Sequence, residues 1–353
     1  MRNDKLIVLL LGIIVVFFVG VVLHELRVVL LPFMIALLLS IIFKPIIVFF
    51  KRKKFPSAIG LIVVLLTFAA FTFLLGLALY SSIGPFVEGL PRYQVRFEQL
   101  FSGVSRGIEA FLIRINVPPE ELDWQSIIDL SSLSSAMTAG LGTFISFVSN
   151  TVLVLLFMLF ILADTGGLGT KVTMAFPENY AHRIAAVIEN IDLQVRQYLI
   201  TKTLVSLTTG TLTWLVLFIL GVDFALIWGF IAFLLNFIPN IGSIIAVIFP
   251  FVWSLLQFDD ATHPILVLAL LGAVQVTMGN LIEPRIMAFR LNLSPLLVLV
   301  SLIFWGWLWG VWGMILAVPL TATIKIFFEN IEPLSPLSVL MSGTSNLLGK
   351  TSK

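Results

Sequence analysis

Two long apolar runs near the carboxyl end, Phe224–Leu256 and Leu293–Phe328, dominate the hydrophobic pattern of this chain. Each has roughly 33–36 residues, whereas one helical crossing of a bilayer needs about 20 and two crossings with a turn need well over 40. Polar or glycine-rich segments interrupt both runs, at Asn236–Gly242 and at Trp305–Gly310. Non-helical backbone at membrane depth is tolerated where it is buried in protein or lines a wet cavity. The pattern therefore predicts two re-entrant helical hairpins, as in secondary transporters.

A short fragment recurs in the two runs. Gly242–Val247 is followed by Pro250, and Gly313–Val318 is followed directly by Pro319. Apolar membrane segments reuse the same few residue types, so chance similarity is the alternative explanation. If the repeat is real, the two hairpins belong to inverted copies of one unit.

The remaining apolar stretches predict about six full spans, so the expected fold is an all-α polytopic membrane protein with two broken hairpins. A polar region, Gly84–Gly142, separates the third span from the fourth and has helical periodicity. It predicts an extracytoplasmic helical insert that serves either as a cap or oligomer contact or as a lid that gathers ligand. The spans are Leu6–Leu23, Val28–Phe50, Ser57–Ser82, Phe144–Ala163, Thr203–Leu220 and Pro264–Leu281.

Loop charges orient the chain. The basic cluster Lys51–Lys54 is expected to stay in the cytoplasm, which also places the amino terminus there. If Phe224–Leu256 crosses the membrane once, Arg285 and Arg290 fall outside, against the positive-inside tendency. If it dips in and returns, both arginines and the carboxyl terminus are cytoplasmic, so we favour that topology. The expected units are scaffold spans 1–83, an insert 84–143, a span with a cytoplasmic amphipathic helix 144–202, a transport core 203–330 and a disordered cytoplasmic tail 331–353.

Composition supports a membrane protein and excludes several function classes. The chain is 59% hydrophobic and 11% charged, against about 25% charged in soluble domains, and its mean hydropathy is +1.10. It contains no cysteine, which excludes disulfides and thiol chemistry. The net charge of +2 gives no case for nucleic acid. Three isolated histidines lack metal-ligand spacing, and neither a phosphate loop nor a hydrolase motif occurs. We expect no enzyme activity and no cofactor.

Polar residues at the first interruption are candidates for binding a solute, because polar groups at membrane depth are costly. They are Asn236, Pro239, Asn240, Gly242 and Ser243. Pro239 removes a backbone donor and leaves carbonyls free, and helix ends can converge on a small polar ligand. The alternative is that the two asparagines merely cap the half-helices.

A second group lies at the end of the seventh span and comprises Gln275, Asn280, Glu283 and Arg285. Gln275 and Glu283 share one helical face. Glu283 could exchange a proton or pair with Arg285 or Arg290. The alternative is a salt bridge at the cytoplasmic edge without a role in transport.

The second interruption contributes Trp305, Gly306 and Gly310, with Pro319 following in the returning half. As a hairpin tip, its indoles could wall a pocket while the glycines allow close backbone approach. As an interfacial aromatic belt, the cluster would be ordinary.

Several motifs resemble the autoinducer-2 exporter family of bacterial permeases. They are Phe237–Gly242, Gly279–Met287, Leu293–Leu296, Phe304–Gly310 and Leu316–Leu320. The family often has Tyr in place of Asn240. The resemblance implies a bacterial inner-membrane protein with about eight hydrophobic segments that works as a homo-oligomer, a pentamer. The family name comes from export of autoinducer-2, and some relatives are linked to sodium or lithium/proton antiport.

The leading hypothesis is a secondary transporter that exports a small polar solute, autoinducer-2-like by resemblance, through an elevator-type movement in the lipid bilayer. Sodium or a proton is the candidate coupling ion. The alternatives are an antiporter in which Glu283 exchanges the ion, and a non-transporting membrane scaffold.

Overall fold

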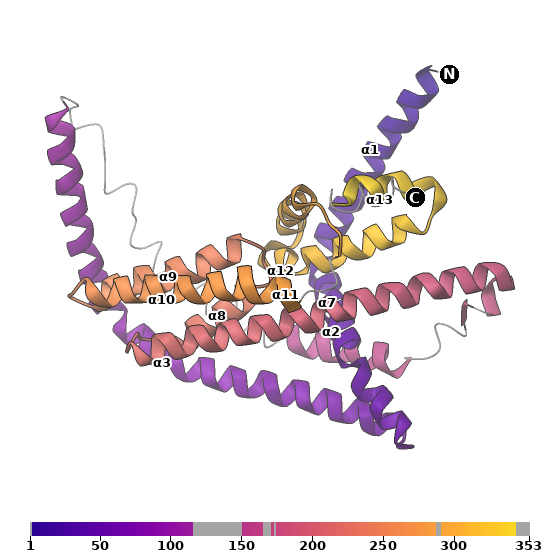
Figure 1. The fold of residues 1–353 in the computed structure, drawn as a ribbon, viewed down its shortest axis with the longest axis horizontal. Coiled ribbons are helices and arrows are strands. Elements are labelled where there is room, and N and C mark those ends of the chain that lie inside the picture. Colours follow the sequence, from indigo (N-terminus) through magenta and orange to yellow (C-terminus); the bar gives the residue numbers. More distant parts are fainter. Residues whose placement is uncertain (1, 116–149, 165–170, 173, 287–290, 344–353) are drawn as a thin grey trace.

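The computed structural model describes residues 2–115, 150–164, 171–172, 174–286 and 291–343. Helices account for most of these residues (Figure 1). An isolated antiparallel bridge pairs Leu293 with Ser342. The helices are α1 (Arg2–Glu25), α2 (Arg27–Arg52), α3 (Ser57–Arg114), α7 (Glu178–Ile219), α8 (Ala225–Leu235), α9 (Ile241–Gln257), α10 (Thr262–Val276), the π-helix η2 (Thr277–Ile282), α11 (Glu283–Ile286), α12 (Pro295–Glu329), the 3-10 helix η3 (Glu332–Leu334) and α13 (Ser335–Met341).

The described helices confirm an all-α membrane architecture. Five segments are long and apolar enough to cross a bilayer, and three shorter apolar helices accompany them. Large apolar side chains such as Leu66, Phe73 and Ile219 are exposed on the helix surfaces, as expected for contact with lipid. The long segments are Arg27–Arg52, Ser57–Ala78, Tyr180–Ile219, Thr262–Ile286 and Pro295–Glu329, and the short ones are Asn150–Ala163, Ala225–Leu235 and Ile241–Gln257.

The first long apolar run is broken where the sequence indicates. Helix α8 has 11 residues and α9 has 17. At 1.5 Å per residue these are about 16 and 26 Å long, shorter than the hydrocarbon core of about 30 Å. Gly242 makes the tight return possible, because a Cβ at this position would lie 1.8 Å from the Leu235 carbonyl oxygen. We call α8 and α9 together hairpin 1.

The second run also turns back on itself. Helix α12 contains non-helical dihedrals at Trp309 (φ −131°, ψ 16°) and Gly310 (φ 64°, ψ −146°). Trp305 Nε1 donates to Thr321 Oγ1 at 3.3 Å although the two residues are 16 apart. A straight helix would separate them by about 24 Å. The two halves of α12 therefore pack alongside each other, and we call them hairpin 2.

Two helices run through the expected unit boundaries. Helix α3 continues unbroken past residue 83 to Arg114, and its far end projects away from α7–α10 (Figure 1). Helix α7 joins the expected cytoplasmic stretch to the fifth span without interruption. The rest of the insert, including Pro118 and Pro119, and the start of the fourth span lie outside the described residues.

The tail from residue 331, expected to be disordered, is ordered as far as residue 343. It forms η3 and α13, with Pro336 in the first turn, where its missing N–H costs nothing. The Ser294 amide donates to the Met341 carbonyl at 3.0 Å, and the Gly343 amide donates to the Asn292 carbonyl at 3.3 Å. These bonds attach the tail to the start of hairpin 2. Residues 344–353 lie outside the described part.

Hairpin 1 is held against α7 by close backbone packing. A Cβ on Gly210 of α7 would lie 2.7 Å from the Gly229 carbonyl oxygen of α8, and the reverse contact would be 2.8 Å. Small residues at helix crossings allow this approach in membranes. Helices α7, α8, α9 and α10 lie roughly alongside one another (Figure 1). This arrangement turns the tip of hairpin 1 toward the end of α10.

Candidate functional site

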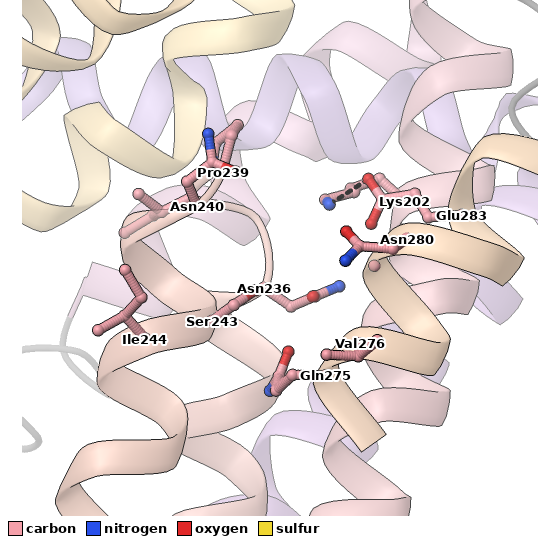
Figure 2. Close-up of a pocket in the computed structure, with 12 residues that line it drawn as sticks. Lys202, Asn236, Pro239, Asn240, Ser243, Ile244, Gln275, Val276, Asn280 and Glu283 are labelled. Carbon is pink, nitrogen blue, oxygen red and sulfur yellow. Dashed lines mark hydrogen bonds and ion pairs between the residues drawn. The ribbon is translucent and has the colours of Figure 1, made fainter. Parts of the chain in front are cut away.

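The break in hairpin 1 places two asparagines at the ends of its helices. Asn236 is the C-cap of α8, and Asn240 precedes α9 with φ 61° and ψ −56°. Positive φ is tolerated more readily by asparagine than by most residues other than glycine. Pro239 lies between them and cannot donate a backbone hydrogen bond. The first turn of α9 then presents Ser243 on the same side as the break (Figure 2).

The opposite wall comes from the end of the α10 helix. Over Thr277–Ile282 the backbone widens to a π-helix before Pro284. Pro284 has no N–H for the Asn280 carbonyl four residues earlier, and its ring would clash with that carbonyl in a regular α-helix. A widened turn relieves the conflict, and such π-helical turns recur at functional sites. Gln275 at the end of α10, Asn280 in the π-helix and Glu283 at the start of α11 lie on the side of hairpin 1 (Figure 2).

These two walls enclose a cavity of about 320 Å³. Four amide side chains, a serine and an ion pair contribute polar groups to it. Its lining residues are Lys202, Asn236, Ile238, Pro239, Asn240, Ser243, Ile244, Gln275, Val276, Gly279, Asn280 and Glu283 (Figure 2). The cavity thus joins the first break with the end of the seventh span, which were separate groups in the sequence.

An ion pair lies at one end of the cavity. Lys202 Nζ is 2.5 Å from Glu283 Oε1, and Lys202 is only 4% exposed. The sequence-based pairing of Glu283 with Arg285 is wrong, because the described ion pair of Glu283 is with Lys202; Arg290 lies outside the described residues. Lys202 was not among the predicted site residues. The available signal was a lone lysine beside the apolar stretch that begins at Thr203.

Two amides in the cavity retain unused acceptors. Asn236 is 5% exposed and its Nδ2 donates to Ser206 Oγ at 2.9 Å, while its Oδ1 has no partner among the described residues. Gln275 is 9% exposed, and its buried Oε1 also has none. A buried polar atom without a partner is costly, so Gln275 Oε1 in particular is suited to a ligand that donates hydrogen bonds.

The remaining predicted site residues lie elsewhere. Gly242 forms the tight return of hairpin 1 behind the cavity wall. Arg285 follows Glu283 in α11 but does not line the cavity. Trp305, Gly306, Gly310 and Pro319 all belong to hairpin 2, where Trp305 bonds to Thr321 and a Cβ on Gly306 would lie 2.8 Å from Met314 Cγ.

The tip of hairpin 2 contacts the end of α1. Trp309 Nε1 donates to the Leu23 carbonyl at 3.1 Å, and His24 Nδ1 donates to the Leu308 carbonyl at 3.1 Å. The His24 ring also stacks on Trp307 with centroids 5.9 Å apart. The carbonyl at the helix break, freed by the non-helical turn, is thus satisfied by protein.

A sequence comparison agrees with this architecture of broken apolar helices and a polar cavity. The sequence model described as AI-2E family transporter matches residues 7–332. The chain belongs to the AI-2E transporter family. This AI-2E family member is therefore a transport protein rather than an enzyme, and a multi-pass bacterial membrane protein in contact with lipid and a small solute.

Relatives of this AI-2E transporter match it along almost its whole length. The AI-2 transport protein TqsA of Escherichia coli (strain K12) is 34% identical over 343 residues, covering 96% of each chain. YhhT of the same organism is 33% identical over 341 residues, covering 95% of this chain and 93% of its own. A Borreliella burgdorferi transport protein is 31% identical over 320 residues, covering 90% of this chain and 85% of its own.

Proposed function

We propose that this protein is a secondary transporter that exports a small polar solute through the cavity between hairpin 1 and the end of α10. The observation that carries the proposal is the convergence of polar groups on one cavity at a helix break, with a buried, unpartnered acceptor on Gln275. Polar groups without a partner are costly in an apolar surrounding. Binding a solute would offset that cost.

The solute we propose is autoinducer-2-like. The support is the printed name of TqsA, an AI-2 transport protein, which this chain resembles at 34% identity. A cavity of about 320 Å³ is large enough for a small polar molecule. The amide side chains Asn236, Asn240, Gln275 and Asn280 supply both donors and acceptors for hydroxyl groups.

Transport in proteoliposomes tests the site. The full chain is reconstituted with autoinducer-2 on one side, and appearance of the signal on the other side is followed over time. We expect Asn236→Leu and Asn240→Leu to reduce the rate at least tenfold. Thr208→Val is the matched control, because Thr208 is exposed on α7 and bonds only to the Leu204 carbonyl of its own helix. Equal rates for all variants would contradict a solute site at the break.

An antiporter is the second candidate, and the buried Lys202–Glu283 pair favours it. A carboxylate that lines a cavity and has a single cationic partner can exchange that partner or a proton during an ion cycle. The test is uptake of sodium or lithium into vesicles driven by a pH gradient. We expect Glu283→Gln to abolish it. Transport of autoinducer-2 without any flux of sodium, lithium or protons would contradict the antiporter and support the exporter.

We further propose that hairpin 1 and its neighbours move as a block against the amino-terminal helices. The outer end of hairpin 1 contacts α3 through Arg96 and Asp259, which are 3.2 Å apart. The cysteine-free chain allows Arg96→Cys and Asp259→Cys to be cross-linked selectively. We expect the cross-link to stop transport. A cross-link between Gly221→Cys and Gln257→Cys lies within the block and should leave transport unchanged. Unchanged transport with the cross-link between Arg96→Cys and Asp259→Cys would contradict the movement.

The assembly and orientation that we propose are a homo-oligomer, a pentamer, in the bacterial inner membrane with both termini cytoplasmic. The basic cluster Lys51–Lys54 supports the orientation. Single cysteines introduced at Lys53 and at Asp260 should react with impermeant thiol reagents from opposite sides of the membrane. Native mass spectrometry from lipid nanodiscs measures the number of subunits.

A further inference from the structure

The ion pair in the cavity is built unlike the other buried lysine pair in the described residues. Lys202 and Glu283 are 81 residues apart, and their side chains are 5% and 20% exposed. Lys325 pairs with Glu329 one turn away on the same helix, at 2.6 Å, and that glutamate is 38% exposed. Glu329 is therefore about twice as exposed as Glu283, and Glu283 in addition lines the cavity.

Glu283 is a partly buried carboxylate whose cationic partner Lys202 is buried. Taking one partner away from a buried ion pair leaves an uncompensated charge, which is strongly destabilising. Among the described residues, Lys202 is the one cation within ion-pair distance of Glu283. The position of its ammonium group is therefore a cation-binding position, occupied by a tethered side chain.

The cavity that contains this position also offers acceptor groups. Gln275 lines it and has a buried Oε1 without a partner, and the Asn236 Nδ2 donates to Ser206, which leaves the Asn236 Oδ1 as an acceptor. Carbonyl oxygens and carboxylates are the groups that bind ammonium groups and hard monovalent ions. Both amides and Glu283 line the same cavity as Lys202 (Figure 2).

We propose that the Lys202 ammonium group is a tethered competitor for a small monovalent cationic group that binds Glu283 in this cavity. The incoming group displaces Lys202 from the carboxylate, and Lys202 returns when the group leaves, so Glu283 is never left without a counter-charge. This inference rests on the proposed solute cavity. The cationic group belongs either to an alkali ion or to a solute that carries a primary ammonium.

Removing the tethered charge exposes the site to external cations. The full-length Lys202→Gln protein is purified in detergent and its unfolding temperature is measured in sodium, lithium, methylammonium or choline chloride at one ionic strength. We expect a saturable rise in the unfolding temperature with the cation that binds, because a ligand that binds only the folded state stabilises it. The wild-type protein should show a smaller rise that needs a higher concentration of the same cation, because Lys202 competes for Glu283.

Two variants make the test specific. Lys325→Gln is the matched control, and it should respond to the cations as the wild type does, because its partner Glu329 is more exposed and lies outside the cavity. Lys202→Gln combined with Glu283→Gln should also lose the cation dependence, since no carboxylate remains at the site. A rise with sodium or lithium alone identifies an alkali ion, and a rise with methylammonium alone identifies an ammonium solute.

Chemical rescue covers the case in which Lys202→Gln is too unstable to purify. Lys202→Cys can be modified with an aminoethyl thiosulfonate, since the chain has no other cysteine. The modified side chain again carries an ammonium group and should reduce the cation dependence of the unmodified variant toward that of the wild type. The proposal is overturned if the unfolding temperature of both Lys202 variants is the same with every cation. It is also overturned if neither variant can be recovered in any salt. These readouts measure binding, so a negative transport assay leaves them unaffected.

Discussion

The two hairpins use the same backbone device in different surroundings. In hairpin 1 a Cβ on Gly242 would lie 1.8 Å from the Leu235 carbonyl oxygen, and in hairpin 2 a Cβ on Gly313 would lie 1.9 Å from the Trp305 carbonyl oxygen. These glycines begin the fragments that recur in the sequence. Both turns therefore depend on the missing side chain, which brings two half-helices into backbone contact.

The tips differ in what satisfies their polar groups. At hairpin 1 the break carries Asn236 and Asn240 and borders the polar cavity. At hairpin 2 the Leu308 carbonyl accepts a hydrogen bond from His24, and the Trp309 indole donates to the Leu23 carbonyl, both at the end of α1. One tip retains unused hydrogen-bonding capacity and the other has used its capacity on the protein. We infer that hairpin 1 serves the solute and hairpin 2 serves the structure.

The largest expected effect comes from the shared glycines. Gly242→Ala and Gly313→Ala each add a methyl group that clashes with a backbone carbonyl oxygen of the facing half-helix. That carbonyl cannot move away unless the hairpin opens. We expect each substitution to lower the free energy of unfolding by about 3 kcal/mol, because a backbone group cannot rotate out of the way as a side chain can. Thermal unfolding in detergent measures it. Gly272→Ala on α10 is the control, since a Cβ there meets nothing within 4 Å, and an equal loss for all three would refute the steric argument.

The next prediction separates the tips by function. Asn236→Leu removes the partner of the Ser206 hydroxyl and fills the cavity with an apolar group, so transport should fall at least tenfold. Trp309→Phe keeps the aromatic packing but loses the bond to the Leu23 carbonyl. We expect it to lower stability by about 1 kcal/mol and to change the transport rate less than twofold. If transport in proteoliposomes fell tenfold with Trp309→Phe and stayed unchanged with Asn236→Leu, the roles that we assign to the two hairpins would be exchanged.

The hairpins were predictable from the sequence because their causes are local. A run of the wrong length, interrupted by Pro239 or by Gly306 and Gly310, has few ways to cross a membrane. Lys202 was missed because its partner Glu283 is 81 residues away, and no local pattern brings the two together. The length of α3 was also missed, since the loss of hydrophobicity near residue 84 marks where an apolar span ends without ending the helix.

A smaller effect is expected at the α1–α2 turn. His24→Ala removes the donor to the Leu308 carbonyl, and a buried carbonyl without a partner costs about 1–2 kcal/mol. Hydrogen exchange at the backbone around Trp309 should accelerate while exchange at Asn236–Asn240 stays unchanged. His182→Ala, on an exposed part of α7, is the control. Equal acceleration at both tips would show that the hairpins open together rather than separately.

The smallest effect is expected at the outer end of hairpin 1, where α3 is attached. The Tyr93 hydroxyl donates to Asp223, whose amide donates to Gln257 Oε1 at 2.7 Å. Burial, and then the bond to Asp223, raise the pKa of Tyr93 above its ordinary value of 10.0. The folded state therefore favours the neutral phenol, and this contribution is present below pH 10 and lost as the pH rises toward the folded-state pKa.

Tyr93→Phe isolates that contribution. It keeps the ring against Trp253, whose centroid is 4.4 Å away, and should cost about 1 kcal/mol at pH 8. The difference in unfolding free energy between wild type and variant should shrink above pH 10, because only the wild type has this phenol to ionise on unfolding. A constant difference from pH 8 to pH 11 would show that the hydroxyl contributes nothing to holding α3 on hairpin 1. Because this contact lies far from the cavity, solute affinity should be the same in both proteins, which distinguishes attachment of hairpin 1 from its role at the tip.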